Sequence, residues 1–160
     1  MAKIKVGFGF DVHQLKQNHP FVLGGVNLEH NSGAYGHSDA DVLLHAICDA
    51  LLGAANLRDI GFHFSNTDDR WKGISSLVLL QHVIALLAEK NWQIGNIDAM
   101  ICLEAPKINP HIPTMQANIA KAAGIDADDI SIKATTNEKL GFIGREEGVV
   151  AYAVCLIEKI

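Results

Sequence analysis

The segment Lys3-Ile4-Lys5-Val6-Gly7-Phe8-Gly9-Phe10-Asp11-Val12-His13 carries the pattern that decides the fold. Apolar residues stand at alternate positions from Ile4 to Phe10, which predicts a β-strand that runs into an Asp-x-His triplet at its end. Side chains alternate along an extended chain, so Asp11 and His13 point to the same side and can bind one metal ion. The triplet does not establish a metal site by itself, because Asp-x-His also occurs by chance.

A helix is predicted from Ser38 or Asp39 to Ala55, where apolar residues recur at helical spacing. His45 lies on this helix. With the Asp-x-His triplet it offers three ligands of the type that zinc prefers, which leaves a fourth position for water or substrate. Asp49 lies four residues further on the same helix face and could orient a ligand or bind a hydroxyl group, or it could be a solvated carboxylate.

The remaining elements follow from periodicity and from glycine positions. We expect a hairpin over residues 21–28 around Gly24-Gly25, a polar mobile loop over 61–73, helices over 75–91 and 115–123, and strands over 94–103, 130–135 and 149–157. The last strand is nearly all apolar, which predicts cover on both sides. The fold class is therefore α/β (α+β): one domain over residues 1–160, with a mixed, mainly four-stranded sheet, helices on one face and a small hairpin.

Composition excludes several functional classes. The chain has 160 residues and a formal net charge of −5 without a Lys/Arg run, which argues against nucleic-acid binding. Its three cysteines stand far apart in apolar contexts, as in a reducing compartment. The positively charged segment 1–5 is followed by Gly7, Gly9 and Asp11, so it predicts neither a signal peptide nor a membrane span. We therefore expect a cytoplasmic protein.

Gly36-His37-Ser38-Asp39 precedes the first predicted helix. At that place His37 and Ser38 would lie where free backbone N–H groups and the helix dipole favour anions, so a phosphate could bind. Alternatively, Ser38 or Asp39 only caps the helix and His37 is a surface residue.

Two further segments could contact a substrate. Asp59-Ile60-Gly61 and the loop after it could bind sugar-like hydroxyl groups, with Phe64 packing on carbon atoms, or it could be a capped turn. Residues 104–113 hold three of the four prolines, and such a rigid backbone suits recognition of a flat base edge. A simple connection between a strand and a helix is the alternative.

The segment 133–139 becomes abruptly polar after a β-branched strand. Thr136 can donate to phosphate oxygens, and Glu138 is a hard oxygen ligand suited to Mg²⁺. The segment 140–145 adds glycines that allow close backbone approach, and Arg145 can contact phosphate in a bidentate manner. Together with the three zinc-type ligands, these residues indicate a metal-assisted phosphate site.

Four segments in this order, 9–13, 37–41 with His45, 59–61 and 134–142, resemble the 2-C-methyl-D-erythritol 2,4-cyclodiphosphate synthase family, and the resemblance covers essentially the whole chain. It implies a phosphorus–oxygen lyase of the non-mevalonate isoprenoid pathway. Such an enzyme cyclises 4-diphosphocytidyl-2-C-methyl-D-erythritol 2-phosphate and releases CMP. The resemblance also implies a homotrimer whose active sites lie between subunits, with the nucleotide part from one subunit and the zinc part from its neighbour.

The resemblance implies roles for individual residues. Asp11, His13 and His45 would hold Zn²⁺, Glu138 would hold Mg²⁺ or Mn²⁺ at the diphosphate, and His37 and Thr136 would stabilise the transition state. The substrate-binding positions would be Ser38, Asp49, Asp59, Ile60, Gly61, Phe64, Ser65, Asn66, Thr67, Asp68, Phe142 and Arg145. The nucleotide-binding positions would be Leu103, Glu104, Ala105, Pro106, Lys107, Ile108, Asn109, Ala134 and Thr135.

The sequence departs from the family pattern in the loop over residues 64–68. The family loop usually reads Phe-Pro-Asp-Thr-Asp, whereas residues 64–68 read Phe-Ser-Asn-Thr-Asp, so Asn66 keeps an acceptor but lacks the charge. Two other functions fit the residues. A zinc-dependent phosphodiesterase or phosphatase would use a bound hydroxide as nucleophile, and a non-catalytic module would bind the nucleotide without turnover.

Overall fold

The computed structural model describes residues 3–160, so Met1 and Ala2 of the positively charged N-terminal segment lie outside the described residues. In chain order the elements are β1 (Ile4–Gln17), β2 (Phe21–Leu23), β3 (Val26–Leu28), β4 (Ser32–Tyr35), α1 (Val42–Ala54), α2 (Ile60–His63), the 3₁₀ turn η1 (Asp69–Trp71), α3 (Ser76–Glu89), β5 (Trp92–Cys102), η2 (Asn109–His111), α4 (Ile112–Ala123), η3 (Ala127–Asp129), β6 (Ile130–Thr135), α5 (Gly141–Gly144) and β7 (Gly148–Lys159).

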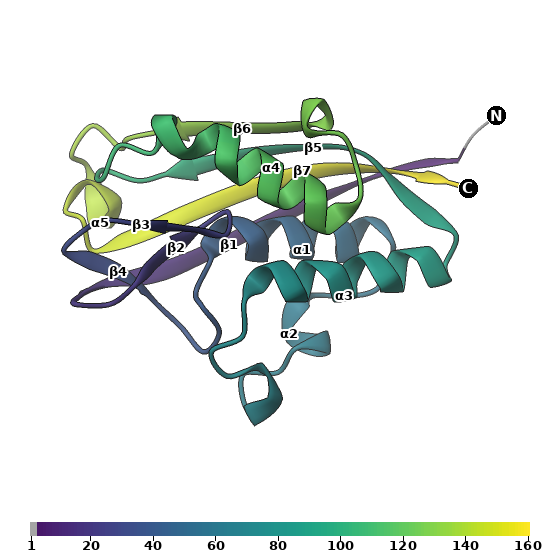
Figure 1. Ribbon diagram of the computed structural model, residues 1–160, viewed down its shortest axis with the longest axis horizontal. Coiled ribbons are helices and arrows are strands. Elements are labelled where there is room, and N and C mark those ends of the chain that lie inside the picture. The colour runs from purple at the N-terminus through teal and green to yellow at the C-terminus, as the bar shows by residue number, and fades with distance from the viewer. Residues whose placement is uncertain (1–2) are drawn as a thin grey trace.

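The main sheet has five strands in the order β4-β1-β7-β5-β6, and β2 and β3 form a separate hairpin. Only β5 and β6 are parallel; the other neighbours are antiparallel. Helix α1 packs on β1 and β7, α4 packs on β6, and α3 lies against both helices, so the long helices cover one face of the sheet (Figure 1). The mixed fold with helices on one face is confirmed. The sheet has five strands instead of mainly four, because the short β4 carries no clear periodicity.

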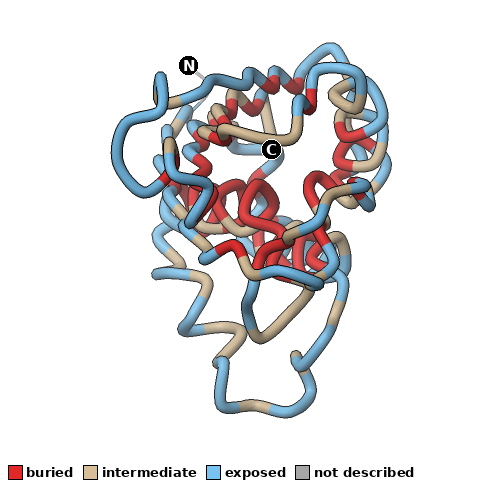
Figure 2. The backbone as a smooth tube through the Cα atoms, turned by 90° about the vertical axis from the view of Figure 1, so that its left-hand side faces the viewer, coloured by how far each residue is buried: buried red, intermediate tan, exposed pale blue. Residues whose placement is uncertain are grey.

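Small residues bring α1 unusually close to β1. A Cβ atom on Gly7 or Gly9 would lie only 1.9 Å from a backbone carbonyl oxygen of α1, that of Ala50 or Ala46. The glycines therefore occupy the inner side of β1, and the large apolar residues between them occupy the outer side. In Figure 2 burial alternates along the strands of the sheet, whereas the helices beneath them are largely buried.

The outer face of the sheet is apolar and exposed in this chain. Phe8 is 62% exposed, and Tyr152 and Val154 on β7 are 39% and 43% exposed. The prediction that β7 is covered on both sides is therefore wrong for the single chain, since α1 covers only its inner face. The apolar composition of β7 reflects two different surroundings, one inside the core and one on the surface.

Two predicted boundaries are also wrong. Strand β1 does not end at the Asp-x-His triplet but continues to Gln17, because pairing with β7 and then β4 extends the ladder. Helix α1 begins at Val42 and its N-cap is Asp41. Residues 37 and 38 therefore stand outside the first turn of α1, four and three residues before its N-cap.

Asp41 is fully buried and joins the hairpin to α1. One carboxylate oxygen accepts hydrogen bonds from the backbone N–H groups of Gly24 and Leu44, at 3.0 Å and 3.1 Å, and the other accepts from Gly25 at 2.8 Å. Burial raises the pKa of this carboxyl to about 6, against the hydrogen bonds that favour the charged form. Asp41 thus fixes where the segment before α1 enters the helix.

The other predicted elements are observed with small changes at their ends. Helix α4 ends at Ala123 with Gly124 as its C-cap, which has φ of 71°, and a β-bulge interrupts β5 at Gly95. The 61–73 loop contains the short helix α2 and the turn η1. In the part of the chain from residue 3 onward, no helix has the length and apolar character needed to cross a membrane.

Candidate metal and substrate site

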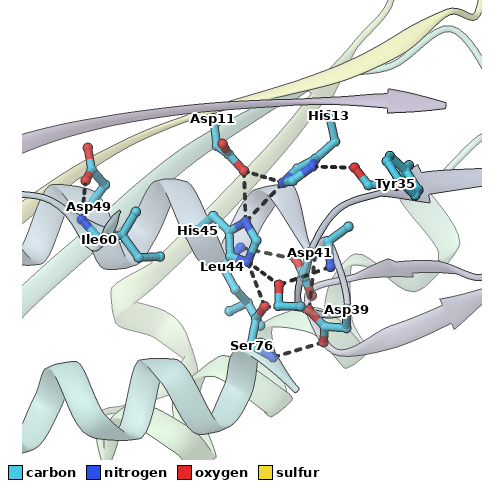
Figure 3. A network of polar contacts seen from close by, with 12 residues as sticks. Asp11, His13, Tyr35, Asp39, Asp41, Leu44, His45, Asp49, Ile60 and Ser76 are labelled. Atoms are coloured by element: carbon cyan, nitrogen blue, oxygen red, sulfur yellow. Dashed lines mark hydrogen bonds and ion pairs between the residues drawn. The ribbon is translucent and has the colours of Figure 1, made fainter. Parts of the chain in front are cut away.

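Asp11, His13 and His45 form a cluster of three ligand atoms from two elements. The Oδ2 atom of Asp11 lies 2.9 Å from Nε2 of His13 and 3.0 Å from Nδ1 of His45, and the two ring nitrogens are 3.1 Å apart. Zinc at about 2.0 Å from each of three tetrahedral ligands would hold them about 3.3 Å apart, so a small expansion accommodates the ion. The three atoms face a common point between β1 and α1 (Figure 3).

The far side of each imidazole ring has its own partner. Nδ1 of His13 contacts the backbone carbonyl of Tyr35 on β4 at 2.9 Å, so this nitrogen carries the hydrogen and donates it. Nε2 of His45 lies 3.0 Å from the Ser38 hydroxyl and 2.9 Å from the Ser76 hydroxyl. These contacts leave Nε2 of His13 and Nδ1 of His45 free to present lone pairs to a cation.

Contacts within the cluster shift the pKa values of Asp11 and His13. Burial acts to raise the pKa of the Asp11 carboxyl, but hydrogen bonds to His13 and His45 outweigh it and hold the pKa at about 2. Burial acts to lower the pKa of the His13 ring, but the hydrogen bond and charge of Asp11 raise it above its usual value of 6.5. A carboxylate that stays ionised beside two imidazoles is a donor set suited to a divalent cation.

The cluster opens into a cavity formed by the segment before α1 and by the 60–71 loop. Its lining residues are Asp11, His13, Gly36, His37, Ser38, His45, Ile60, Gly61, Phe64, Asn66, Trp71 and Leu79. His37 reaches across the cavity to the loop, since its Nε2 atom lies 3.2 Å from the backbone carbonyl of Asp68. The ring of Phe64 packs edge-on against Trp71 at 5.0 Å. The departure from the usual loop sequence, Asn66, thus faces the same cavity as the metal ligands.

A second cavity lies at the ends of β5 and β6. It is lined by Leu103, Glu104, Pro106, Lys107, Ile108, Asn109, Ala134, Thr135 and Thr136. The backbone N–H of Asn137 donates to the Glu104 carboxylate at 3.2 Å, which ties the two connecting segments together. Apart from Ala105, all residues predicted to bind the nucleotide line this cavity. Among residues 3–160, which the structure describes, none lines both cavities, so the two parts of the predicted site are separate within one chain.

A statistical model of the YgbB family matches residues 4–158. The chain belongs to the YgbB family. It is 66% identical over 157 residues to the 2-C-methyl-D-erythritol 2,4-cyclodiphosphate synthase of Cytophaga hutchinsonii, covering 98% of this chain and 99% of that protein. It is 63% identical over 158 residues to the enzyme of the same name from Bacteroides fragilis, covering 99% of each chain. The family predicted from the four sequence segments is confirmed.

Solved structures of similar proteins have the same fold. The bifunctional IspDF of Campylobacter jejuni matches with a TM-score of 0.96 and 39% identity; the match covers 100% of this chain but only 43% of that longer one. The CDP complex of IspF from Plasmodium falciparum matches with a TM-score of 0.86 and 33% identity, covering 98% of this chain and 96% of that one.

Several predicted substrate residues of this YgbB chain lie away from the cavity lining and have local partners. Asp59 caps α2 by accepting from the backbone N–H of Phe62 at 3.2 Å, and Asp49 accepts from the backbone N–H of Ile60 at 3.0 Å. The hydroxyl groups of Ser65 and Thr67 are 2.8 Å apart. The Asp68 carboxylate pairs with Arg70. These contacts shape the loop around Ile60, Gly61 and Phe64.

Glu138, Phe142 and Arg145 lie outside the linings of both cavities. Glu138 follows β6, is exposed, and has φ of 51°. Its backbone N–H donates to the Thr136 hydroxyl at 3.3 Å. Arg145 pairs with Glu147 at 2.9 Å, and Phe142 is 42% exposed on α5. The chain thus carries two groups of predicted residues, one around His45 and one around Thr136, without bringing them together.

Sequence reasoning missed three residues that line or support the cavity beside Asp11, His13 and His45. Trp71 could have been identified, since a large aromatic residue inside a polar loop is unusual. Leu79 and Ser76 belong to α3 and carry no signal, because their proximity to His45 depends on how α3 packs against α1.

Proposed function

We propose that this protein converts 4-diphosphocytidyl-2-C-methyl-D-erythritol 2-phosphate into 2-C-methyl-D-erythritol 2,4-cyclodiphosphate and releases CMP. It would thus act as a phosphorus–oxygen lyase of the non-mevalonate isoprenoid pathway. The observation that carries the proposal is the convergence of Asp11, His13 and His45 at one cavity in a chain whose relatives carry this enzyme name.

The ligand chemistry supports Zn²⁺ at this cluster, because two imidazoles and one carboxylate are typical catalytic zinc ligands and harder ions prefer oxygen. When bound, the ion would supply positive charge beside the reacting phosphates. The residues around it would bind and orient the substrate. His37 and Ser38 face the cavity and can donate to phosphate oxygens, while Gly61 and Phe64 border the space for the methylerythritol carbon atoms.

The reaction requires two anionic phosphates to approach each other. Two unit charges 4 Å apart repel by about 4 kcal/mol at an effective dielectric constant near 20, so the site has to neutralise charge before ring closure. The nucleophile is a phosphate oxygen that is already ionised, so no serine or cysteine nucleophile is needed. Holding both ends of the substrate close together then provides most of the remaining acceleration.

We assign the second cavity to the cytidine part of the substrate. Pro106 and Ile108 give it apolar walls, Lys107 gives it positive charge, and Thr136 borders it. A Plasmodium falciparum relative has been solved in complex with CDP, which supports a nucleotide pocket in the family. In this proposal Glu138 holds Mg²⁺ or Mn²⁺ at the diphosphate, and Thr136 contacts phosphate together with His37 of another subunit.

A homotrimer would complete the site. One substrate molecule has to occupy both cavities, yet the two linings have no residue in common in the described part of one chain. The exposed apolar face of β1 and β7 supplies a surface for assembly, since Val6 is 64% exposed and Phe8 62%. Three copies packed through this face would bring the zinc side of one subunit to the nucleotide side of its neighbour.

The cysteines support a cytoplasmic location. Cys48, Cys102 and Cys155 are all free thiols, as expected in a reducing compartment.

The activity is tested by phosphorus NMR after incubation of the purified protein with the phosphorylated cytidyl substrate and divalent ions. We expect the cyclic diphosphate and CMP, and no product from His45→Ala. His19→Ala is the matched control, because His19 lies in the turn after β1, outside both cavity linings. A linear phosphate product that carries oxygen from labelled water would identify a hydrolase and refute the proposal.

Sharing of the site between subunits has its own test. Co-expression of His45→Ala chains with Thr136→Ala chains should give mixed trimers in which about a quarter of the sites have both intact parts. Each variant alone should be inactive. Failure of the mixture to recover activity, in trimers shown to be mixed by sequential purification on a different affinity tag for each variant, would contradict the shared site but leave the cyclase activity untouched.

A further inference from the structure

Asp39 and Ser76 form a hydrogen-bonded pair directly behind His45 (Figure 3). The Ser76 hydroxyl donates to Oδ1 of Asp39 at 2.5 Å, and the Ser76 backbone N–H donates to Oδ2 at 2.9 Å. The same hydroxyl lies 2.9 Å from Nε2 of His45. Ser76 is fully buried and is the first residue of α3.

The direction of these hydrogen bonds follows from the chemistry of the groups. Nδ1 of His45 faces Asp11 and His13, so it must keep its lone pair to bind a cation, and the ring hydrogen is then on Nε2. Ser76 donates its only hydroxyl hydrogen to the carboxylate, so its oxygen is free to accept from that Nε2–H. The result is a chain from Asp39 through Ser76 to His45 in which every group has a partner.

We propose that Asp39 and Ser76 are positioning residues for the metal site. Acting through the far nitrogen of His45, they hold the imidazole in the tautomer and orientation that cation binding requires. This inference rests on the proposed metal-binding role of Asp11, His13 and His45. Partners of this kind behind a metal-binding histidine typically change metal affinity 10–100-fold when they are removed.

The backbone around the pair keeps it in place. The Asp39 N–H donates to the carbonyl of Ile74 at 3.1 Å, and the Gly73 N–H donates to the carbonyl of His37 at 2.8 Å. Between the two carboxylates of Asp39 and Asp41 the chain turns at Ala40, a buried residue with φ of 57°. Asp41 therefore turns toward the hairpin while Asp39 turns toward α3.

The hydroxyl groups of Ser38 and Ser76 both contact His45 but have different surroundings. Ser38 also contacts Nε2 of His45, at 3.0 Å, but it lines the cavity, whereas Ser76 lies behind the ring and outside the cavity lining. Ser76 can hold the ring while Ser38 remains available to a ligand. Because Ser38 would still accept from Nε2–H after loss of Ser76, we expect a tenfold effect for Ser76→Ala, at the lower end of the usual range.

The test measures metal binding to the metal-free full-length protein, with Co²⁺ or Zn²⁺ alone as the probe. Competition against a coloured chelator gives the affinity, and the visible absorption of Co²⁺ reports its coordination geometry. Ser76→Ala should weaken binding about tenfold and change the Co²⁺ spectrum. Ser75→Ala is the matched control, because Ser75 is the exposed neighbour at the start of α3 and its side chain makes no capping hydrogen bond; it should bind as the wild type does.

Asp39→Asn provides a second variant that retains side-chain size. It should also weaken binding, and the double variant with Ser76→Ala should lose no more than the stronger single variant, since both residues act along one chain. Additive losses, or wild-type affinity and spectrum in Ser76→Ala, would overturn the inference alone. A wild-type protein that binds neither ion would overturn both this inference and the metal assignment beneath it.

Discussion

Substitution of Gly9 by alanine tests the idea that the glycines of β1 set the metal site. The added Cβ would lie 1.9 Å from the backbone carbonyl oxygen of Ala46, and ordinary contacts begin at 3.4 Å. Backbone cannot rotate away as a flexible side chain can, so α1 would have to move by about 1.5 Å relative to β1. Gly9 is two residues from Asp11, and Ala46 adjoins His45, so the movement would separate these two ligands.

The expected size of the effect follows from these distances. Overpacking of a core costs about 1–3 kcal/mol, which for a chain of this length corresponds to a fall in Tm of about 2–12 °C. Metal sites tolerate changes in ligand distance of only about 0.2 Å, so a displacement of about 1.5 Å should abolish tight cation binding. Gly9→Ala should therefore lose metal binding even under conditions where the protein remains folded.

The assay combines thermal unfolding, followed by circular dichroism, with chelator competition for Zn²⁺. Gly53→Ala is the matched control on α1 itself, because a Cβ atom there meets nothing within 4 Å. It should leave metal affinity unchanged and stabilise the protein by about 0.5–1 kcal/mol, the usual gain from replacing a helical glycine. The reasoning is refuted if Gly9→Ala shows the Tm and the Zn²⁺ affinity of the wild type.

Four further predictions concern charge and burial. Protons compete with the cation for His13, whose pKa Asp11 raises above 6.5, so Zn²⁺ affinity measured by titration should fall about tenfold per pH unit below that pKa and level off above it. In the metal-free protein the protonated His13 stabilises the fold fully below pH 6.5, so unfolding by urea should become easier as the pH rises through the folded-state pKa; a stability that rises instead would contradict this. Asp41→Ala leaves the N–H groups of Gly24, Gly25 and Leu44 without their acceptor and should destabilise the protein by about 2–4 kcal/mol in urea titrations, and an unchanged midpoint would refute the bridging role. Burial raises the pKa of the Cys155 thiol to about 12 and that of Cys48 still further, so both should resist alkylation in the native protein and react after denaturation, and rapid native labelling of either would contradict their burial.

The exposed face of β1 shows where periodicity stops being informative. The alternation of Gly7 and Gly9 with Phe8 and Phe10 predicts a strand correctly, because alternation depends only on the extended backbone. The alternation does not show which face of the strand packs against the protein core. Small residues face inward because α1 needs close approach, and the phenylalanines face outward, where we propose that a second subunit covers them.

The segment before α1 shows that the local sequence does not fix the start of a helix either. Ser38, Asp39 and Asp41 are all good N-cap residues, and the sequence offers no local reason to choose among them. The choice falls on Asp41 because Gly24 and Gly25 of the distant hairpin also donate to its carboxylate. Asp39 is then left free to bond Ser76.

Local patterns in the sequence are sufficient to predict the strand that carries Asp11 and His13, their common side, the hairpin turn and the family of the chain. All of these depend on residues close together or on the order of short motifs. Three-dimensional packing was needed to show that His45 meets the Asp-x-His pair, that Ser76 lies behind His45, and that Thr136 and Glu138 lie away from it. Such contacts join residues far apart in the chain, and the packing of α1 and α3 against the sheet and each other sets them.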